Sequence, residues 1–378
     1  METIFWLALA GSLYSYAFYP AILTLLPKRK RVKRNEPQEW PSVALIITAH
    51  NEERRISAKL DNCLELDYPS DRLSIIVASD ASTDRTDEIT HSYSGRGVQV
   101  IRAHTREGKE NAQLQAIRST EAPILVFSDV ATHIGPGAIK RVAMQLSDPA
   151  IGAVSSEDRF VTANGQVAGE GIYVRYEMWL RRLESSVNTL VGLSGSFFAA
   201  RRSICADWDT GSPSDFNTAM NAVRQGYLAI SDPGLLGIYP DIKNENGEYQ
   251  RKTRTILRGL TALARHAEVL NPYQYGLFSF QIWSHKVMRW LVPWFLVTIL
   301  FASLNLALGE GSRFFIAVLA VQISLYGLVA VGTVSRQSRK RWWIKIPYYF
   351  VQTNLAAAHA TVAYLLGQRV ITWQPSVR

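Results

Sequence analysis

The amino-acid sequence predicts an α/β fold built on a mixed, mainly parallel sheet, together with transmembrane helices. Short apolar runs of strand length alternate with helical patterns between residues 43 and 129, which is typical of parallel strands joined by crossover helices. Polar residues cluster at the ends of these runs. Hydrophobic residues make up 47% of the chain and charged residues only 19%, a balance that indicates membrane segments.

Four apolar runs predict the first strands of the sheet, at residues 43–48, 73–78, 98–101 and 124–127. The fourth run, Ile-Leu-Val-Phe, predicts a strand that is buried on both faces. Helical patterns follow the first three runs, and the third helix opens at Gly108-Lys109. This order predicts parallel strands with right-handed crossovers.

Polar side chains follow the carboxyl ends of three of these runs. They are His50, Asn51 and Glu52 after the first, Asp80 and Asp84 after the second, and Asp129 after the fourth. Because the carboxyl ends of parallel strands share one edge of a sheet, we expect these side chains to converge on one crevice. A carboxylate there suits Mg²⁺ or Mn²⁺ held against a diphosphate. A strand-end aspartate that only stabilises a turn is the alternative.

Glycine-rich phosphate-binding motifs are absent from the sequence. Neither Gly-x-Gly-x-x-Gly nor Gly-x-x-x-x-Gly-Lys-Ser/Thr occurs, which argues against a dinucleotide-binding fold and against a P-loop. The two cysteines, Cys63 and Cys205, have no metal-binding spacing and predict neither a zinc site nor a disulfide framework. A nucleotide held by carboxylates and a metal fits this sequence better.

The positive charge of the chain lies next to its apolar segments. The formal net charge is +9, which would suit nucleic acid or an anionic membrane surface. Basic clusters follow apolar runs at residues 28–34 and 336–341, which is the pattern of cytoplasmic loops. This placement favours the membrane.

Four segments are candidates for membrane insertion. Residues 4–26 carry no charge and predict a permanent anchor rather than a cleaved signal peptide, because the basic cluster follows the apolar run instead of preceding it. Residues 290–309 and 314–334 are each long enough to span. Residues 346–366, with Gln352, Asn354 and His359 at their centre, predict a further span or, as we favour, a re-entrant or interfacial segment.

Three segments beyond the fourth strand carry further candidates. Residues 151–160 predict a strand, and 172–188 a helix whose polar face fits a solvated surface or an acceptor-binding surface. Gly195 and Ser196 lie in a small, flexible stretch that permits close approach of a ligand to the backbone or a plain tight turn. Asp215 precedes a helix that runs to Gln225, where it or Ser214 fits a helix cap.

These motifs together resemble the membrane-anchored family 2 glycosyltransferases, the broad group that includes cellulose and hyaluronan synthases. The resemblance lies in Thr-Ala-His-Asn-Glu at 48–52, Asp-Ala-Ser-Thr-Asp at 80–84, Gly-Lys at 108–109 and Phe-Ser-Asp at 127–129. It covers roughly residues 42–260 and implies a GT-A fold, a nucleotide-diphosphate sugar donor, and Mg²⁺ or Mn²⁺ as cofactor.

The resemblance also implies roles for individual residues. Asp129 would bind the metal, and Asp215 would deprotonate the acceptor hydroxyl as the general base. Gly195 and Ser196 would lie beside the sugar and the acceptor. The residues expected to bind the donor are Thr48, Ala49, His50, Asn51, Glu52, Asp80, Lys109 and Ser128.

The sequence departs from the family pattern at three places. The second acid of the usual Asp-x-Asp falls at Ala131, and the first member of the usual acidic pair falls at Ser214. Arg251 and Arg254 match a basic segment that in the family offsets the charge of the leaving diphosphate, but the Arg-Trp pair of processive synthases is missing. The missing Arg-Trp pair favours transfer of one sugar, whereas the acids lost at Ala131 and Ser214 would suit an inactive domain that senses nucleotide sugars.

We therefore expect a bacterial inner-membrane, multi-pass glycosyltransferase that acts by inversion on a lipid, lipid-linked or saccharide acceptor and binds no nucleic acid. The alternatives are a processive polysaccharide synthase and an inactive membrane protein that senses nucleotide sugars. The expected domains are an anchor at 1–27, a basic linker at 28–41, a cytoplasmic GT-A domain at 42–262, interfacial helices at 263–289, a membrane region at 290–366 and a tail at 367–378.

Overall fold

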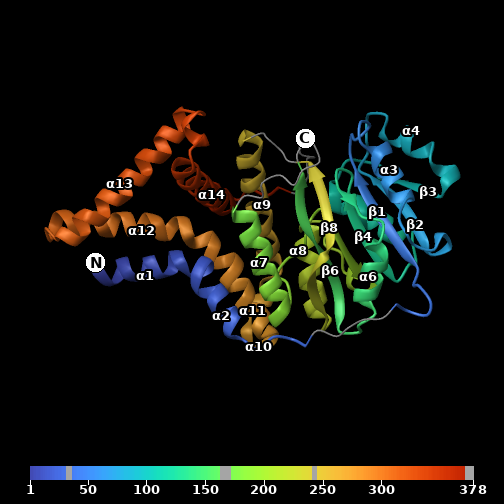
Figure 1. Ribbon diagram of the computed structural model, residues 1–378, viewed down its shortest axis with the longest axis horizontal. Coiled ribbons are helices and arrows are strands. Elements are labelled where there is room, and N and C mark those ends of the chain that lie inside the picture. Colours follow the sequence, from blue (N-terminus) through green and yellow to red (C-terminus); the bar gives the residue numbers. More distant parts are fainter. Residues whose placement is uncertain (31–35, 162–171, 241–244, 371–378) are drawn as a thin grey trace. The chain divides into compact units, whose positions relative to one another are not determined.

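The computed structural model describes residues 1–30, 36–161, 172–240 and 245–370 (Figure 1). Most of the first basic cluster, from Arg31, and most of the tail lie outside these residues. The chain divides into two compact units. One contains Leu26–Lys243, Ala262–Phe278 and Val370–Arg378, and the other contains Met1–Leu25, Asn244–Thr261 and Ser279–Arg369. Each is described by itself.

The first unit is organised around an eight-stranded mixed sheet with the order β3-β2-β1-β4-β7-β6-β8-β5. Its strands are β1 Val43–Ala49, β2 Leu73–Ser79, β3 Val98–Arg102, β4 Ile124–Asp129, β5 His133–Ile134, β6 Ile151–Val161, β7 Phe197–Arg201 and β8 Leu228–Pro240. The pairs among β3, β2, β1 and β4 are parallel, which confirms the four predicted strands. Strand β7 pairs antiparallel with β4 and β6, and β5 pairs antiparallel with β8, so the sheet is mixed.

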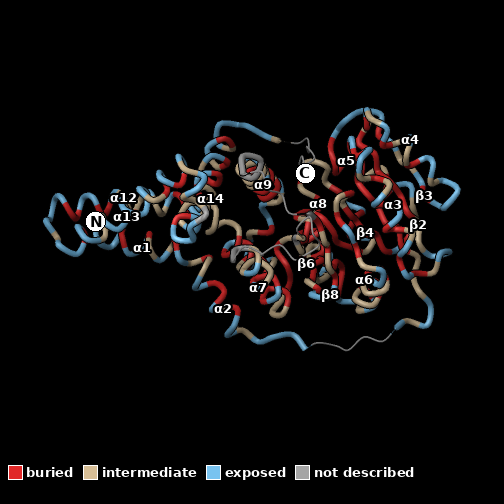
Figure 2. The backbone as a smooth tube through the Cα atoms, turned by 45° about the horizontal axis from the view of Figure 1, so that its top comes forward, coloured by how far each residue is buried: buried red, intermediate tan, exposed pale blue. Residues whose placement is uncertain are grey.

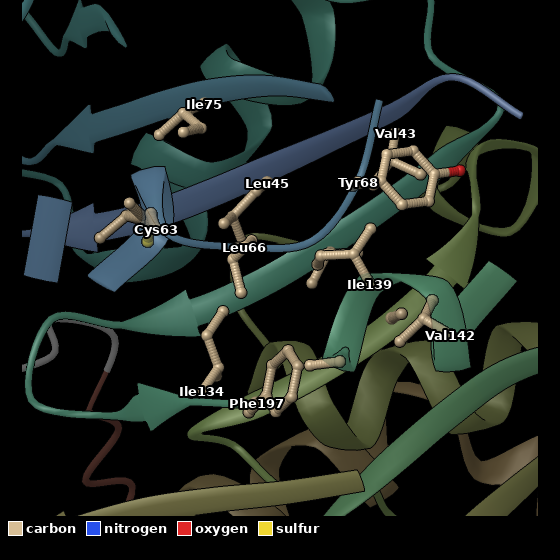
Figure 3. Packing of buried hydrophobic residues seen from close by; sticks show 14 of the residues in the cluster. Val43, Leu45, Cys63, Leu66, Tyr68, Ile75, Ile134, Ile139, Val142 and Phe197 are labelled. Atoms are coloured by element: carbon tan, nitrogen blue, oxygen red, sulfur yellow. The ribbon is translucent and has the colours of Figure 1, made fainter. Parts of the chain in front are cut away.

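Helices cover both faces of this sheet. They are α3 Ile56–Leu64, α4 Thr86–His91, α5 Lys109–Arg118, α6 Ala138–Leu146, α7 Ile172–Val187 and α8 Ser214–Arg224. Every residue of β1 is buried, as its apolar run predicts. Its neighbour β4 is buried along most of its length (Figure 2). Val43, Leu45 and Ile47 of β1 pack with α3 and α6, part of the cluster that Figure 3 shows, whereas Ala44 and Ile46 pack with α5 and α8. Alternate residues of a strand thus face opposite helix layers.

Helix α7 presents its polar residues to the protein as well as to solvent. Arg181 and Glu184 are buried. The Arg181 guanidinium donates to Ser155 Oγ at 2.5 Å, and Arg182 forms a two-pronged ion pair with the buried Glu157. A fully solvated polar face, one of the two interpretations of this helix, is therefore wrong for Arg181 and Glu184, which are buried, whereas the Arg182 side chain is 51% exposed.

A charged cluster holds the end of α9 (Glu245–Arg265) against the segment that precedes α8. Arg265 donates twice to the Asp209 carboxylate, at 3.0 and 2.9 Å, and His266 Nε2 lies 3.0 Å from the same group. Because Arg224 can only donate to His266 Nδ1, the imidazole proton sits on Nε2 and is donated to Asp209. Burial alone would raise the pKa of Asp209, but the bonds from Arg265, Ser212 and Gly211 lower it to about 2.

Replacing Asp209 by Asn is expected to lower the free energy of unfolding by about 1 kcal/mol at pH 7, after allowance for solvent screening of this partly exposed cluster. The pKa of Asp209 is lower in the folded state than its ordinary 3.8, so the ionised carboxylate stabilises the fold above about pH 4. That contribution disappears as the pH falls through about 2. Urea unfolding at pH 7 and near pH 2 measures the difference, and an equal cost at both values would contradict the assignment.

The second unit is helical. Its helices are α1 Glu2–Leu13, a π-helical turn Tyr14–Phe18, α2 Tyr19–Leu25, α11 Leu277–Ile282, a second π-helical turn Trp283–Val287, α12 Met288–Gly309, α13 Arg313–Val334 and α14 Trp342–Leu365, together with most of α9. Phe5 and Ala8 of α1 pack with Ile299 and Ala302 of α12 and with Phe315 of α13. In the described residues, two helices, Leu277–Gly309 and Arg313–Val334, have the length and apolar composition to cross a membrane. This agrees with the predicted spans at 290–309 and 314–334.

The last helix, α14, corrects one expectation. It is a single helix of 24 residues, so a re-entrant hairpin over 346–366 is wrong, whereas an interfacial segment and a further span both stay predictions. The polar residues that suggested a hairpin are accommodated within the helical unit. Asn354 is buried and donates to the Phe350 carbonyl at 2.9 Å, and Tyr249 of α9 lies 3.4 Å from His359. The sequence showed the polar side chains but not the helix that packs beside them.

Candidate active site

The polar residues predicted at the ends of β1 and β2 lie together. The Asp80 backbone N–H donates to the Ala49 carbonyl at 2.9 Å, and His50 Nδ1 donates to the Asp80 carbonyl at 2.7 Å. In the parallel pairing of β1 with β4, Thr48 lies opposite Asp129. The expected convergence of the three strand ends is thus confirmed.

Two residues at this edge have backbone conformations that side chains disfavour. Asn51 has φ 54° and Ala81 has φ 49°, both in the left-handed region. Asn tolerates this conformation, and Asn51 Oδ1 accepts a hydrogen bond from the Thr83 N–H at 2.8 Å. Strained residues gather at functional sites more often than elsewhere, and both outliers lie directly after the carboxyl ends of β1 and β2.

The Asp80 carboxylate fixes the turn that leads into α5. It is fully buried and accepts hydrogen bonds from the N–H groups of Glu107 and Gly108, each at 3.0 Å. Gly108 has φ 102°, which only glycine adopts readily. This arrangement sets the first helical residue, Lys109, at the strand ends.

Lys109 connects the residues predicted to bind metal and acceptor. Its ammonium group donates to Asp129 Oδ1 at 2.6 Å and to the Gly195 carbonyl at 2.8 Å. A Cβ atom at Gly195 would lie 3.4 Å from Asp215 Oδ2. The side chains of Lys109 and Asp129 are 8% and 22% exposed, so the ion pair is largely shielded while Asp129 keeps access to solvent. Four residues far apart in the sequence therefore form one group.

Asp215 does not cap helix α8. The helix begins at Ser214, its N-cap is Pro213, and no side chain caps it by a hydrogen bond. The prediction that Ser214 or Asp215 acts as the cap is therefore wrong, because a proline occupies the N-cap position. Asp215 lies in the first turn, where the helix dipole favours a negative charge. Asp215 is half-buried, and its carboxylate lies beside Gly195.

Asp158 supports the loop that carries Gly195, and the sequence analysis did not single it out. Its carboxylate accepts hydrogen bonds from the hydroxyls of Ser194 and Ser196, the residues on either side of Gly195, the second at 2.9 Å. The signal was present in the polar residues that end the apolar part of β6. Those polar residues did not indicate that Asp158 would bind Ser194, which lies 36 residues away in the chain.

Lys59 was missed in the same way. It lies on α3 with Ile56, Leu60 and Cys63, which are spaced to face the core. A lysine on the buried stripe of an amphipathic helix was therefore a signal in the sequence. Its ammonium group donates to Ser128 Oγ at 2.8 Å, so the hydroxyl of Ser128, predicted to bind the donor, faces α3.

The residues around Asp129 suit only one mode of metal binding. No group of three or more His, Cys, Asp or Glu side chains that could hold a metal occurs in the described residues. Ala131 supplies no ligand, and Asp129 Oδ1 is paired with Lys109. Mg²⁺ and Mn²⁺ can nevertheless bind through one carboxylate and the phosphates of a substrate. The donor set fits such a shared ion and does not form a cage for the metal alone.

Arg251 and Arg254 lie on α9, in the helical unit. Burial lowers the pKa of Arg254, and the positive charges of Arg258 and Arg251 lower it further. The three arginines therefore gather on one side of the helix, spaced at one-turn intervals. Their assignment to the donor diphosphate stays a prediction.

Comparison with known proteins gives consistent matches. Residues 44–208 match the sequence model described as Glycosyl transferase family 2. An N-acetylglucosaminyltransferase of Mesorhizobium japonicum is 31% identical over 47% of this chain and 39% of its own length. A beta-monoglucosyldiacylglycerol synthase of Synechocystis is 25% identical over 44% of this chain and 36% of its own. The chain thus spans well under half the length of these relatives.

One solved structure matches nearly the whole chain. It is the mannosyltransferase PcManGT from Pyrobaculum calidifontis in complex with GDP-Man and Mn²⁺. The TM-score is 0.74 at 22% sequence identity, and the match covers 97% of this chain and 99% of that one. At this identity the likeness concerns the fold.

Proposed function

We propose that this chain transfers a sugar from a nucleotide-diphosphate sugar to an acceptor hydroxyl. The proposal is supported by the match of residues 44–208 to the model of family 2 glycosyltransferases and by the similarity of the fold to that of a solved mannosyltransferase. The acceptor is a lipid, a lipid-linked saccharide or a saccharide, and the transfer inverts the anomeric centre. One observation carries the proposal: Lys109 joins Asp129 to the Gly195 carbonyl, directly beside the Asp215 carboxylate.

The proposed roles follow from the chemistry of this group. Asp215 takes the proton of the acceptor hydroxyl as that oxygen attacks the sugar. Lys109 offers a positive charge where the diphosphate departs, and Gly195 leaves room for the sugar next to both. Arg251 and Arg254 are proposed to offset the remaining diphosphate charge. A divalent ion, bound through Asp129 and the donor phosphates, would add Lewis-acid stabilisation of the leaving group.

The membrane is proposed as the place of action. The apolar helices Leu277–Gly309 and Arg313–Val334, the uncharged run at 4–26 and the basic clusters beside these segments support a multi-pass protein of the bacterial inner membrane with a cytoplasmic catalytic unit. A diacylglycerol-type acceptor is consistent with the name of the Synechocystis relative.

A processive polysaccharide synthase is the second candidate. It is favoured by a 24% identical relative, the poly-beta-1,6-N-acetyl-D-glucosamine synthase of Staphylococcus epidermidis, of which this chain covers 50%. The missing Arg-Trp pair after Arg254 argues for single transfer. Product length, measured by mass spectrometry, separates the two.

The test is a donor panel. Detergent-purified protein with a membrane lipid extract receives UDP-glucose, UDP-N-acetylglucosamine or GDP-mannose with Mn²⁺ or Mg²⁺, and released nucleoside diphosphate is recorded. Release with one donor that depends on the lipid extract supports the transferase. Donor binding without release under every condition would instead support the nucleotide-sugar sensor.

A further inference from the structure

Two lysines approach the end of β4 from opposite faces of the sheet. Ser128 shares the orientation of Val126, which packs with α3, whereas Asp129 shares that of Phe127, which packs with α5. Lys59 of α3 accordingly reaches Ser128, and Lys109 of α5 reaches Asp129. The strand end is thus enclosed between two ammonium groups.

Lys59 fixes the turn that contains Asp129. Its ammonium group donates to Ser128 Oγ at 2.8 Å and to the Thr132 carbonyl at 2.6 Å, so it bridges the two ends of the turn. The Thr132 N–H closes the turn by donating to the Asp129 carbonyl at 3.1 Å. Lys59 is only 3% exposed, so its position is set by packing.

The charge of Lys59 is costly for a role that is only structural. Burial lowers the pKa of Lys59, and the negative charge of Asp129 opposes this effect. Asn62, about one turn further along α3, holds the next part of the same segment without a charge. Its carboxamide exchanges two hydrogen bonds with the Ile134 backbone, at 2.9 and 3.0 Å. Helix α3 therefore holds one part of this segment through the uncharged Asn62 and another part through the cation of Lys59.

We propose that Lys59 is a positioning residue for the donor diphosphate: it fixes the turn that presents Asp129 and places a buried positive charge beneath it. This inference rests on the proposed function. In this site Ala131 stands where the resembled family has a second metal-binding acid. A fixed lysine would reduce the electrostatic repulsion between the donor phosphates and the single carboxylate of Asp129.

The experiment measures equilibrium binding of UDP and of GDP by calorimetry, with Mn²⁺, on the full-length protein in detergent. Lys59→Met is expected to weaken the binding of the nucleoside diphosphate that the wild type prefers by about tenfold or more, equivalent to about 1.4 kcal/mol. Lys59→Gln replaces the ammonium group by a neutral amide that can still donate hydrogen bonds. We expect this variant to lose a similar factor in nucleotide affinity, while its thermal unfolding temperature stays closer to that of the wild type. Lys140→Met, which removes a lysine from a surface ion pair with Asp67, is the matched control and should bind as the wild type does.

The outcomes are separable. If the wild type binds and both Lys59 variants bind with an unchanged dissociation constant, the inference is overturned, even if their unfolding temperatures fall. If Lys59→Met does not fold, the affinity of Lys59→Gln decides. A wild type that binds neither nucleotide would overturn the proposed function itself, and this inference with it.

Discussion

Replacing Asp215 by Asn is expected to lower glycosyl transfer by about three orders of magnitude, within the range for loss of a general base. The amide has the same shape but cannot take the proton of the acceptor hydroxyl. Asp215 makes no capping hydrogen bond, so the fold of α8 should survive the change. Initial rates of nucleoside diphosphate release, with the donor identified by the panel, measure the effect.

The binding of UDP or GDP should stay the same in Asp215→Asn, because the carboxylate lies on the acceptor side of Gly195 in the proposed arrangement. Asp71→Asn is the control, since Asp71 is a surface carboxylate that is 78% exposed. A variant at Asp215 that turns over at the wild-type rate would remove the base from the mechanism and favour the sensor interpretation.

Replacing Asp129 by Asn is expected to abolish metal-dependent transfer, with a loss of about 100-fold or more in turnover. The substitution removes the negative charge that pairs with Lys109 at 2.6 Å and that lies within electrostatic reach of Lys59. The two cations then repel each other across the strand end, and a divalent ion loses its protein oxygen. Turnover and the dependence of nucleotide binding on Mn²⁺ concentration are the measurements.

A double-mutant cycle with Lys109→Met tests whether the pair acts as a unit. If it does, Asp129→Asn combined with Lys109→Met should cost little more than either change alone. The ion pair of Lys140 with Asp67, at 2.7 Å on the surface, offers the matched cycle, for which we expect no effect on turnover. Fully additive losses at Asp129 and Lys109 would show that each residue acts separately.

The sequence by itself determined the strands and the edge at which the site lies. Continuous apolar runs such as Val43–Ile47 and Ile124–Phe127 are typical of strands that are buried on both faces of a sheet. The polar residues that follow such runs must then meet at the carboxyl edge. For this reason, Asp80 and Asp129 could be placed near one another before the structure was known.

Only the tertiary structure decided which side chains meet within the site. Lys109 and Gly195 are 86 residues apart, and their contact depends on β7 pairing antiparallel with β4, which local periodicity does not encode. The buried cation Lys59, the support of Asp158 and the continuity of α14 depend likewise on partners far away in the chain. The hydrophobic pattern selects which face of an element is buried, whereas the partners of a buried polar group are set by the packing of whole elements.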